Sequence, residues 1–177
     1  ESEAAITSRV RPLAAAGVAG VASESIIDCT NSGKVDIDIA AAAGSTANQY
    51  FLAYNEVQVG GVVAKSIKKA DECHNTGAMK VNLHMTAANG SSGSVGGVIG
   101  WGSGSVTNCS NKARMEVTPR LSDTNVAGVL AKCTATFDKL SNLADETANA
   151  GIFVTIDTPS SGNQGKNLNV GGLVGWT

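Results

Sequence analysis

Apolar and polar residues alternate with a period of two in four short stretches of this chain. The clearest stretch is Val35-Asp36-Ile37-Asp38-Ile39, in which valine or isoleucine occupies every second position. The same alternation recurs at residues 79–85, 115–117 and 152–156. It predicts strands that bury one face and expose the other. Helical periodicity is nearly absent, so we expect an all-β protein.

A repeat places these stretches at related points along the chain. Each copy opens on glycine, carries an apolar residue nine positions later, cysteine or leucine at twelve and asparagine at fourteen. Four copies are complete and a fifth begins at Gly172. The complete copies open on Gly17, Gly61, Gly97 and Gly128. The twelfth position holds Cys29, Cys73, Cys109 and Leu140, and the fourteenth holds Asn31, Asn75, Asn111 and Asn142.

Each complete copy contains three strand-like stretches: the glycine-rich run, a run leading into the cysteine column, and the alternating stretch. This organisation predicts one three-stranded coil of a parallel β-solenoid per copy, with coils stacked about 4.8 Å apart. Residues 1–177 then form a single solenoid domain of four coils and part of a fifth, with variable loops on one face. The sequence leaves open whether this domain belongs to a longer protein.

Stacked coils place equivalent residues above one another as ladders. The asparagine column is predicted to form a ladder of side-chain amides at a bend. The repeated glycine is expected to serve either a positive φ or close packing. One outward column supports this register, because Asp36, Lys80 and Glu116 alternate in charge seven residues after the cysteine column. Opposite charges on paired strands favour the pairing by roughly 0.2–1 kcal/mol.

The four cysteines admit two interpretations. In an oxidising compartment they could form two disulfides. We favour reduced, buried thiols for Cys29, Cys73 and Cys109, because Leu140 fills the same column in the fourth copy. A position that accepts either cysteine or leucine is typically buried and apolar. Cys133 lies outside this column.

Composition narrows the classes of function. The net charge of −2 gives no reason to expect a nucleic-acid partner. No apolar run reaches the roughly 18 residues of a transmembrane helix, so no membrane-spanning segment is expected. Charged residues make up 16% of the chain and it contains 21 glycines, a profile typical of exported β-rich proteins. We therefore expect a secreted or cell-surface protein.

Few residues could carry chemistry. His74 and Cys73 are adjacent on a strand and should point to opposite faces, so we expect no metal site. Asp36 and Asp38 share one face and could serve a carbohydrate-active site. An exposed charged ladder is the simpler interpretation of that face. The sequence contains no nucleophile elbow, phosphate-binding loop or dinucleotide fingerprint. We expect no cofactor and no enzymatic activity.

Two groups of aromatic residues are candidates for contacts with a partner or a glycan. Trp101 and Trp176 share the column four residues after the repeat glycine, which Lys65 and Lys132 occupy in other copies. A column that accepts lysine faces solvent, so both tryptophans are predicted to be exposed. The densest aromatic cluster lies in the loop between the first two copies and consists of Tyr50, Phe51 and Tyr54.

The stretch Val95-Gly96-Gly97-Val98-Ile99-Gly100-Trp101, with Val106-Thr107-Asn108-Cys109-Ser110-Asn111 after it, resembles the GLUG motif. Val170-Gly171-Gly172-Leu173-Val174-Gly175-Trp176 is similar to it, whereas the fourth copy departs from it at Ala127 and Leu140. GLUG repeats occur in large exported bacterial proteins, notably of Bacteroidetes, and in some adhesin-like surface proteins. The resemblance implies a surface or secreted β-solenoid and supplies no catalytic residues.

These features predict a structural or adhesive surface protein in which a rigid solenoid carries contact loops. The alternative is a carbohydrate-binding or carbohydrate-active β-helix. The fifth copy stops before its second strand, and residues 4–10 resemble the missing half of a coil. We expect another segment to complete this half-coil, and a segment from a neighbouring copy would produce a filament. The predicted partners are further copies of the chain or another surface protein.

Overall fold

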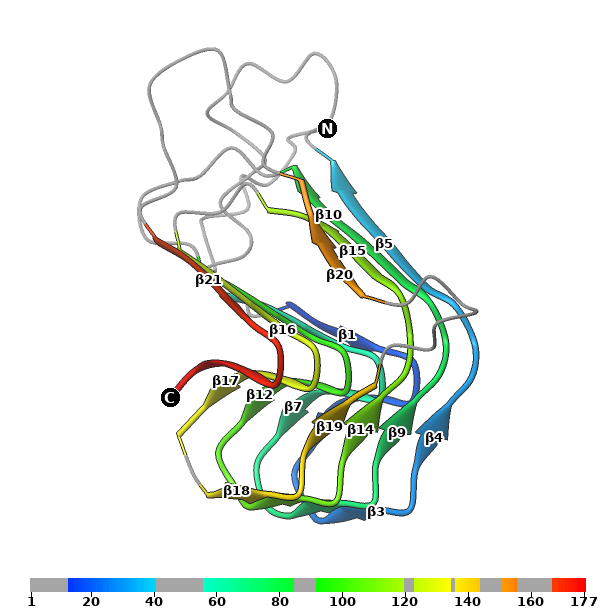
Figure 1. Ribbon diagram of the computed structural model, residues 1–177. Coiled ribbons are helices and arrows are strands. Elements are labelled where there is room, and N and C mark those ends of the chain that lie inside the picture. Colours follow the sequence, from blue (N-terminus) through cyan, green and yellow to red (C-terminus); the bar gives the residue numbers. More distant parts are fainter. Residues whose placement is uncertain are drawn as a thin grey trace, which may run out of the picture.

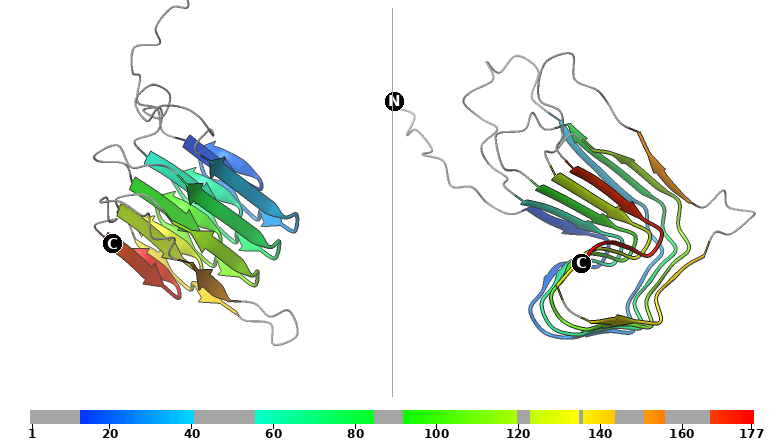
Figure 2. Two further views of the ribbon diagram at one scale, coloured as in Figure 1. Left: turned by 90° about the horizontal axis from the view of Figure 1, so that it is seen from above. Right: turned by 60° about the vertical axis from the view of Figure 1, so that its left-hand side comes forward.

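The computed structural model describes residues 13–40, 56–84, 92–119, 123–134, 136–143, 151–155 and 167–177. Within these residues the chain forms 22 strands and no helix. The strands follow one another in coils, which lie side by side in sequence order from blue to red (Figure 1; Figure 2). The all-β prediction is therefore confirmed.

Four coils contain five strands each, and the fifth contains two. The first coil consists of β1 (Leu13–Ala16), β2 (Ala19–Ala22), β3 (Ile26–Ile27), β4 (Thr30–Asn31) and β5 (Val35–Ala40). The second consists of β6 (Glu56–Gly60), β7 (Val63–Ser66), β8 (Ala70–Asp71), β9 (His74–Asn75) and β10 (Met79–His84). The third consists of β11 (Ser92–Gly96), β12 (Ile99–Gly102), β13 (Val106–Thr107), β14 (Ser110–Asn111) and β15 (Met115–Thr118). The fourth consists of β16 (Asp123–Ala127), β17 (Leu130–Cys133), β18 (Phe137–Asp138), β19 (Ser141–Asn142) and β20 (Ile152–Val154). The fifth consists of β21 (Asn167–Gly171) and β22 (Val174–Trp176).

Equivalent strands of successive coils pair into five sheets, which we name A to E in the order in which the chain enters them. Sheet A contains β1, β6, β11, β16 and β21, and sheet B contains β2, β7, β12, β17 and β22. Sheets C, D and E contain four strands each and begin with β3, β4 and β5. The strand pairs are parallel. The fold is therefore a parallel β-solenoid, as predicted.

The register of the strand pairs superposes the columns that the repeat predicts. Lys80 pairs with Asp36 in the preceding coil and with Glu116 in the next, as the alternating charges indicate. The pairs on either side of the cysteine column are also in register, which superposes Cys29, Cys73, Cys109 and Leu140. One coil per repeat, with equivalent residues stacked, is thus the observed arrangement.

Each complete coil has five strands where the sequence analysis expected three stretches, because two of those stretches bend. In the third coil the glycine-rich run bends at Gly97 and Val98, between β11 and β12. The run into the cysteine column bends at Asn108, whose φ is 54°. The equivalent residues Asp28, Glu72 and Lys139 have φ values of 53°, 53° and 51°. A left-handed corner therefore turns every complete coil from sheet C into sheet D.

Two apolar cores fill the coils. The first is formed by sheets B and C with their adjoining turns, and it contains the cysteine column with Val62, Val98, Ile99, Val129 and Leu130. The second is formed by sheets A and E and contains Val59, Met79, Val81, Met115 and Val117. Each of these ten aliphatic or methionine side chains is at most 1% exposed. The alternating stretches thus bury one face, as their period of two predicts.

Candidate binding surfaces

The asparagine column forms the predicted ladder of side-chain amides. The Nδ2 of each asparagine donates to the Oδ1 of the next, over 2.9 Å from Asn31 to Asn75 and 3.0 Å for the pairs Asn75 to Asn111 and Asn111 to Asn142. Each of the first three amides also bonds to the backbone two residues on. In the second coil Asn75 donates to the Gly77 carbonyl at 3.1 Å and accepts from the Gly77 N–H at 3.3 Å. The ladder therefore joins the coils and holds the turn that leads into sheet E.

The repeated glycines pack directly against this ladder. A Cβ atom added to Gly97 would lie 2.6 Å from Cγ of Asn111 and would overlap the carbonyl oxygen of Gly128 in the next coil. A Cβ atom on Gly61 would lie 2.5 Å from Cγ of Asn75. The backbone of these glycines is outside the left-handed region. Close packing, rather than a positive φ, therefore explains why glycine and asparagine recur fourteen positions apart.

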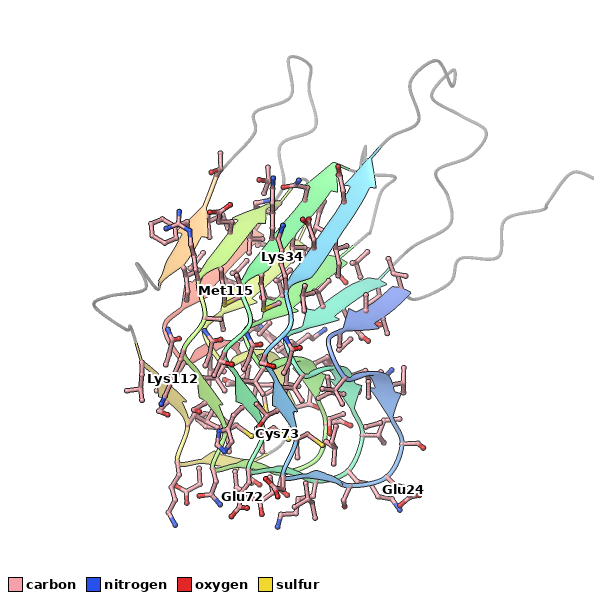
Figure 3. The ribbon with its side chains drawn as sticks, turned by 90° about the vertical axis from the view of Figure 1, so that its right-hand side faces the viewer. Glu24, Lys34, Glu72, Cys73, Lys112 and Met115 are labelled. Carbon is pink, nitrogen blue, oxygen red and sulfur yellow. The ribbon has the colours of Figure 1, made fainter. Side chains whose placement is uncertain are left out.

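The cysteine column lies in the core formed by sheets B and C with their adjoining turns. All the cysteines are free thiols, with Cys73 and Cys109 buried, Cys29 half-buried and Leu140 packed against the same core. Figure 3 shows Cys73 inside its coil. A hydrogen bond with the Cys109 thiol, together with burial, raises the pKa of Cys73, which keeps this thiol protonated. The thiols of Cys73 and Cys109 are thus buried as predicted, whereas Cys29 in the first coil is only half-buried, and Cys133 lies in the same core.

The outward column of sheet B alternates lysine and tryptophan. Trp101 pairs with Lys65 on one side and Lys132 on the other, and Lys132 pairs with Trp176. The Nζ of Lys65 lies 4.4 Å from the centre of the Trp101 ring, and that of Lys132 lies 5.3 Å from the Trp176 ring. Such cation–π contacts contribute about 0.5–1 kcal/mol each at exposed sites. Trp176 is 45% exposed, as predicted, whereas Trp101, Lys65 and Lys132 are half-buried, and a role of this column in binding stays a prediction.

The face that carries Asp36 and Asp38 is exposed, as the alternation predicts. The Nζ of Lys34 lies 2.5 Å from the Asp36 carboxylate, and this hydrogen bond lowers the pKa of Asp36. Two coils further on, Arg114 and Glu116 form the equivalent ion pair at 2.7 Å. A general acid in glycoside hydrolysis needs a raised pKa, which is the opposite of what Lys34 imposes on Asp36. This geometry favours the charged ladder over a catalytic site.

Sequence reasoning missed a polar corner around Asp71. Its carboxylate accepts hydrogen bonds from Thr107 Oγ1 at 2.5 Å and Asn108 Nδ2 at 2.9 Å, and it lies 2.7 Å from the Nζ of Lys69. These contacts, led by the one with Lys69, lower the pKa of Asp71 to about 2. They join the second and third coils outside the core. Its column holds isoleucine, aspartate, threonine and aspartate in successive coils, so no single residue type recurs there to indicate this corner.

The structure around the remaining candidate residues that it describes indicates no catalytic or metal-binding role. His74 is half-buried, and its Nδ1 lies 2.7 Å from Ser110 Oγ. Within the described ranges, no three side chains of histidine, cysteine, aspartate or glutamate are grouped so as to hold a metal ion. The predicted aromatic contacts Tyr50, Phe51 and Tyr54 lie outside the described residues, as do residues 4–10.

The fold and its columns define the class of protein as a parallel β-solenoid repeat protein. Comparisons with models of protein families, with curated proteins and with solved structures find no match. The resemblance to GLUG repeats therefore stays a prediction. In the part of the chain that the structure describes, no helix has the length and apolar character needed to cross a membrane.

Proposed function

We propose that the protein is a non-enzymatic structural scaffold, secreted or displayed on the cell surface, whose coils stack end to end on further copies. One apolar column carries this proposal. Val62, Val98 and Val129 occupy it in the middle coils and are fully buried, at 0% exposure. Val18 in the first coil is 49% exposed and Leu173 in the fifth is 43% exposed. A coil of another copy, stacked in the same register, would bury either end as the middle coils bury one another.

The direction of the asparagine ladder is compatible with head-to-tail stacking. Each Nδ2 donates towards the next coil, so an Oδ1 faces the first coil's open side and an Nδ2 faces the open side of the fourth. Within the described coils Asn31 accepts no amide from a preceding coil, and Asn142 has no following asparagine. The two ends of the described ladder therefore present unlike groups, an acceptor at the first coil and a donor at the fourth.

The two ends also differ in outline. Within the described residues sheets A and B have five strands, whereas sheets C, D and E have four, so the fifth coil contributes strands to sheets A and B alone. If the first coil of a neighbouring copy stacked on β21 and β22, the positions beside β18, β19 and β20 would stay empty. Residues 4–10, which resemble half a coil in sequence, are the segment we propose to contribute to these positions in the neighbouring copy.

The proposal is tested by sedimentation velocity over a range of concentrations, with electron microscopy of the same samples. The chain should form concentration-dependent linear particles. Leu173→Lys, which places a charge in the end face, should abolish them. Ile67→Lys is the matched control, because Ile67 is 42% exposed but lies on the side of the second coil. A chain that stays monomeric at every concentration, or that loses assembly equally with both substitutions, would contradict end-to-end stacking.

Carbohydrate binding is the second candidate function, and the alternating lysine and tryptophan column of sheet B is the observation that favours it. The Asp36 face supports it less, since Asp36 is ion-paired. A scaffold at the cell surface and a glycan-binding adhesin are compatible roles, because the end faces and the column of sheet B are different surfaces. The resemblance to GLUG repeats supports the extracellular location of both.

A further inference from the structure

Four outward side chains on successive coils of sheet B form a surface that we call the Lys–Trp stripe: Lys65, Trp101, Lys132 and Trp176. Coils in register lie about 4.8 Å apart, so like residues in the stripe recur about every 10 Å along the solenoid axis. The stripe therefore presents two interleaved series of the same period, one of ammonium groups and one of indole rings.

The lysines of the stripe have no carboxylate partner among the described residues. The ion pairs of the described coils involve Lys34, Lys68, Lys69 and Arg114. Lys65 and Lys132 instead rest on the rings of Trp101 and Trp176. A cation–π contact at an exposed site is weak, so an anion from outside the chain can attract each ammonium without breaking an ion pair.

A buried amide without a hydrogen-bond partner lies on the neighbouring sheet. Gln58 is 1% exposed, and neither its Oε1 nor its Nε2 has a hydrogen-bond partner. Val57 and Val59 on either side of it lie in the core formed by sheets A and E, so Gln58 points to the other side of sheet A. That side faces sheet B, because a Cβ atom on Gly100 would lie 2.7 Å from the Val59 carbonyl oxygen. The unused donor and acceptor of Gln58 thus lie on the side of sheet A that packs against sheet B, and the stripe occupies the outward positions of sheet B.

We propose that the Lys–Trp stripe binds a linear, β-linked polysaccharide that carries a carboxylate on every second sugar. A disaccharide of this kind is about as long as two coil spacings. Each carboxylate would then meet a lysine, and the apolar face of the intervening sugar would lie on the indole ring that the lysine has left. The stripe runs along the axis of the coils, which suits an extended polymer rather than a compact ligand. This inference does not depend on end-to-end stacking.

Intrinsic fluorescence gives a direct test, because Trp101 and Trp176 are the chain's two tryptophans. A hyaluronan decasaccharide consists of five disaccharides, each of which carries one carboxylate. It should change the tryptophan emission in a saturable manner, and added salt should weaken the binding. A chitin oligosaccharide of ten sugars, which is neutral, should bind at least tenfold more weakly. The same ranking is expected from calorimetry, which reports binding independently of the rings.

Paired substitutions with equal loss of charge locate the site. Lys65→Gln combined with Lys132→Gln should weaken hyaluronan binding at least tenfold at an unchanged melting temperature. Lys34→Gln combined with Lys68→Gln removes the same charge from other surfaces and should leave the affinity within twofold. The proposal is overturned if neither oligosaccharide binds, if both bind equally, or if the two double variants lose affinity to the same extent. None of these outcomes bears on sedimentation, so failure of this proposal and failure of the scaffold proposal are distinguishable.

Discussion

The middle coils and the end coils carry the same residue types at the same positions, yet they differ in burial. Val98 in the third coil is 0% exposed, whereas Val18 in the first coil is 49% exposed. Phe137 in the fourth coil is 44% exposed, whereas its partner Val106 is fully buried. In a solenoid each coil contacts its neighbours alone, so the burial of a residue is decided by the coils on either side of it.

This difference has an energetic consequence. Fully burying a valine or leucine side chain contributes roughly 1.5–3 kcal/mol, and a half-exposed side chain realises part of that. Equal substitutions should therefore cost more in the third coil than in the first or fifth. The predictions below compare matched positions of one column, from the largest expected effect to the smallest.

The largest contrast is expected between two repeat glycines. Gly97→Ala would place a methyl group against the Gly128 carbonyl and the Asn111 amide, and neither can move without shifting a neighbouring coil. We expect a loss of more than about 3 kcal/mol in the free energy of unfolding, since overpacking a rigid site is costly. Gly172→Ala adds the same methyl group where no atom lies within 4 Å and should cost less than about 0.5 kcal/mol. Urea unfolding followed by circular dichroism measures both.

The two glycine variants also test the explanation of the fourteen-residue spacing. If Gly97→Ala were tolerated as well as Gly172→Ala, close packing against the asparagine ladder would not be the reason for the repeated glycine. A double variant, Gly97→Ala with Asn111→Ala, separates the two overlaps. Removing the amide should recover part of the loss, and the remaining loss would belong to the Gly128 carbonyl.

A smaller contrast is expected between two rungs of the asparagine ladder. Asn75 accepts from Asn31, donates to Asn111 and holds both backbone groups of Gly77. Asn75→Ala removes these four hydrogen bonds from a buried site, although the Gly77 N–H keeps a bond to the Asn31 carbonyl, and we expect a loss of about 3 kcal/mol. Asn142 is half-buried and accepts from one neighbouring amide, so Asn142→Ala should cost about 1 kcal/mol.

Amide hydrogen exchange distinguishes this ladder effect from general loosening. In Asn75→Ala the Gly77 N–H loses its bond to the Asn75 side chain, retains only the one to the Asn31 carbonyl, and should lose more protection than amides of sheet A do. Equal costs for the two variants would show that the ladder stabilises each turn separately. In that case the chain of amide bonds between coils would contribute little.

The sequence predicted the columns because each column repeats one kind of chemistry. Glycine, cysteine and asparagine recur at fixed offsets, and the structure superposes them, with the two amides of Asn75 and Asn111 joined over 3.0 Å. The division of each coil into five strands could not be predicted, because the corner position holds aspartate, glutamate, asparagine and lysine in turn. Lysine and glutamate are not typical of positive φ, so neither Lys139 nor Glu72 indicates a turn by itself.

The candidate site was predicted in part for a related reason. The alternation of lysine and tryptophan is visible in the sequence, and it indicated an exposed column. The contacts of Lys65 and Lys132 with tryptophan rings were not predicted. They depend on the side-chain conformation that places each ammonium over the ring of the next coil. The buried, unpaired amide of Gln58 could not be predicted from the sequence. Its column holds alanine, serine and asparagine in the other coils, so no residue type recurs there.

The smallest effect on stability is expected at the corner around Asp71, where the second and third coils make polar contacts. Its pKa in the folded protein is about 2, below the roughly 3.9 of an unperturbed aspartate. The stabilising contribution of this carboxylate is therefore fully present above about pH 4 and is lost as the pH falls towards 2. Asp71→Asn should lower the urea midpoint at pH 7 and flatten its dependence on pH between 4 and 2. Asp138→Asn removes a carboxylate of the same column from β18, the last strand of sheet C in the described residues, and should change the midpoint less. An unchanged pH profile in Asp71→Asn would mean that Thr107 and Asn108 hold the two coils together without the carboxylate charge.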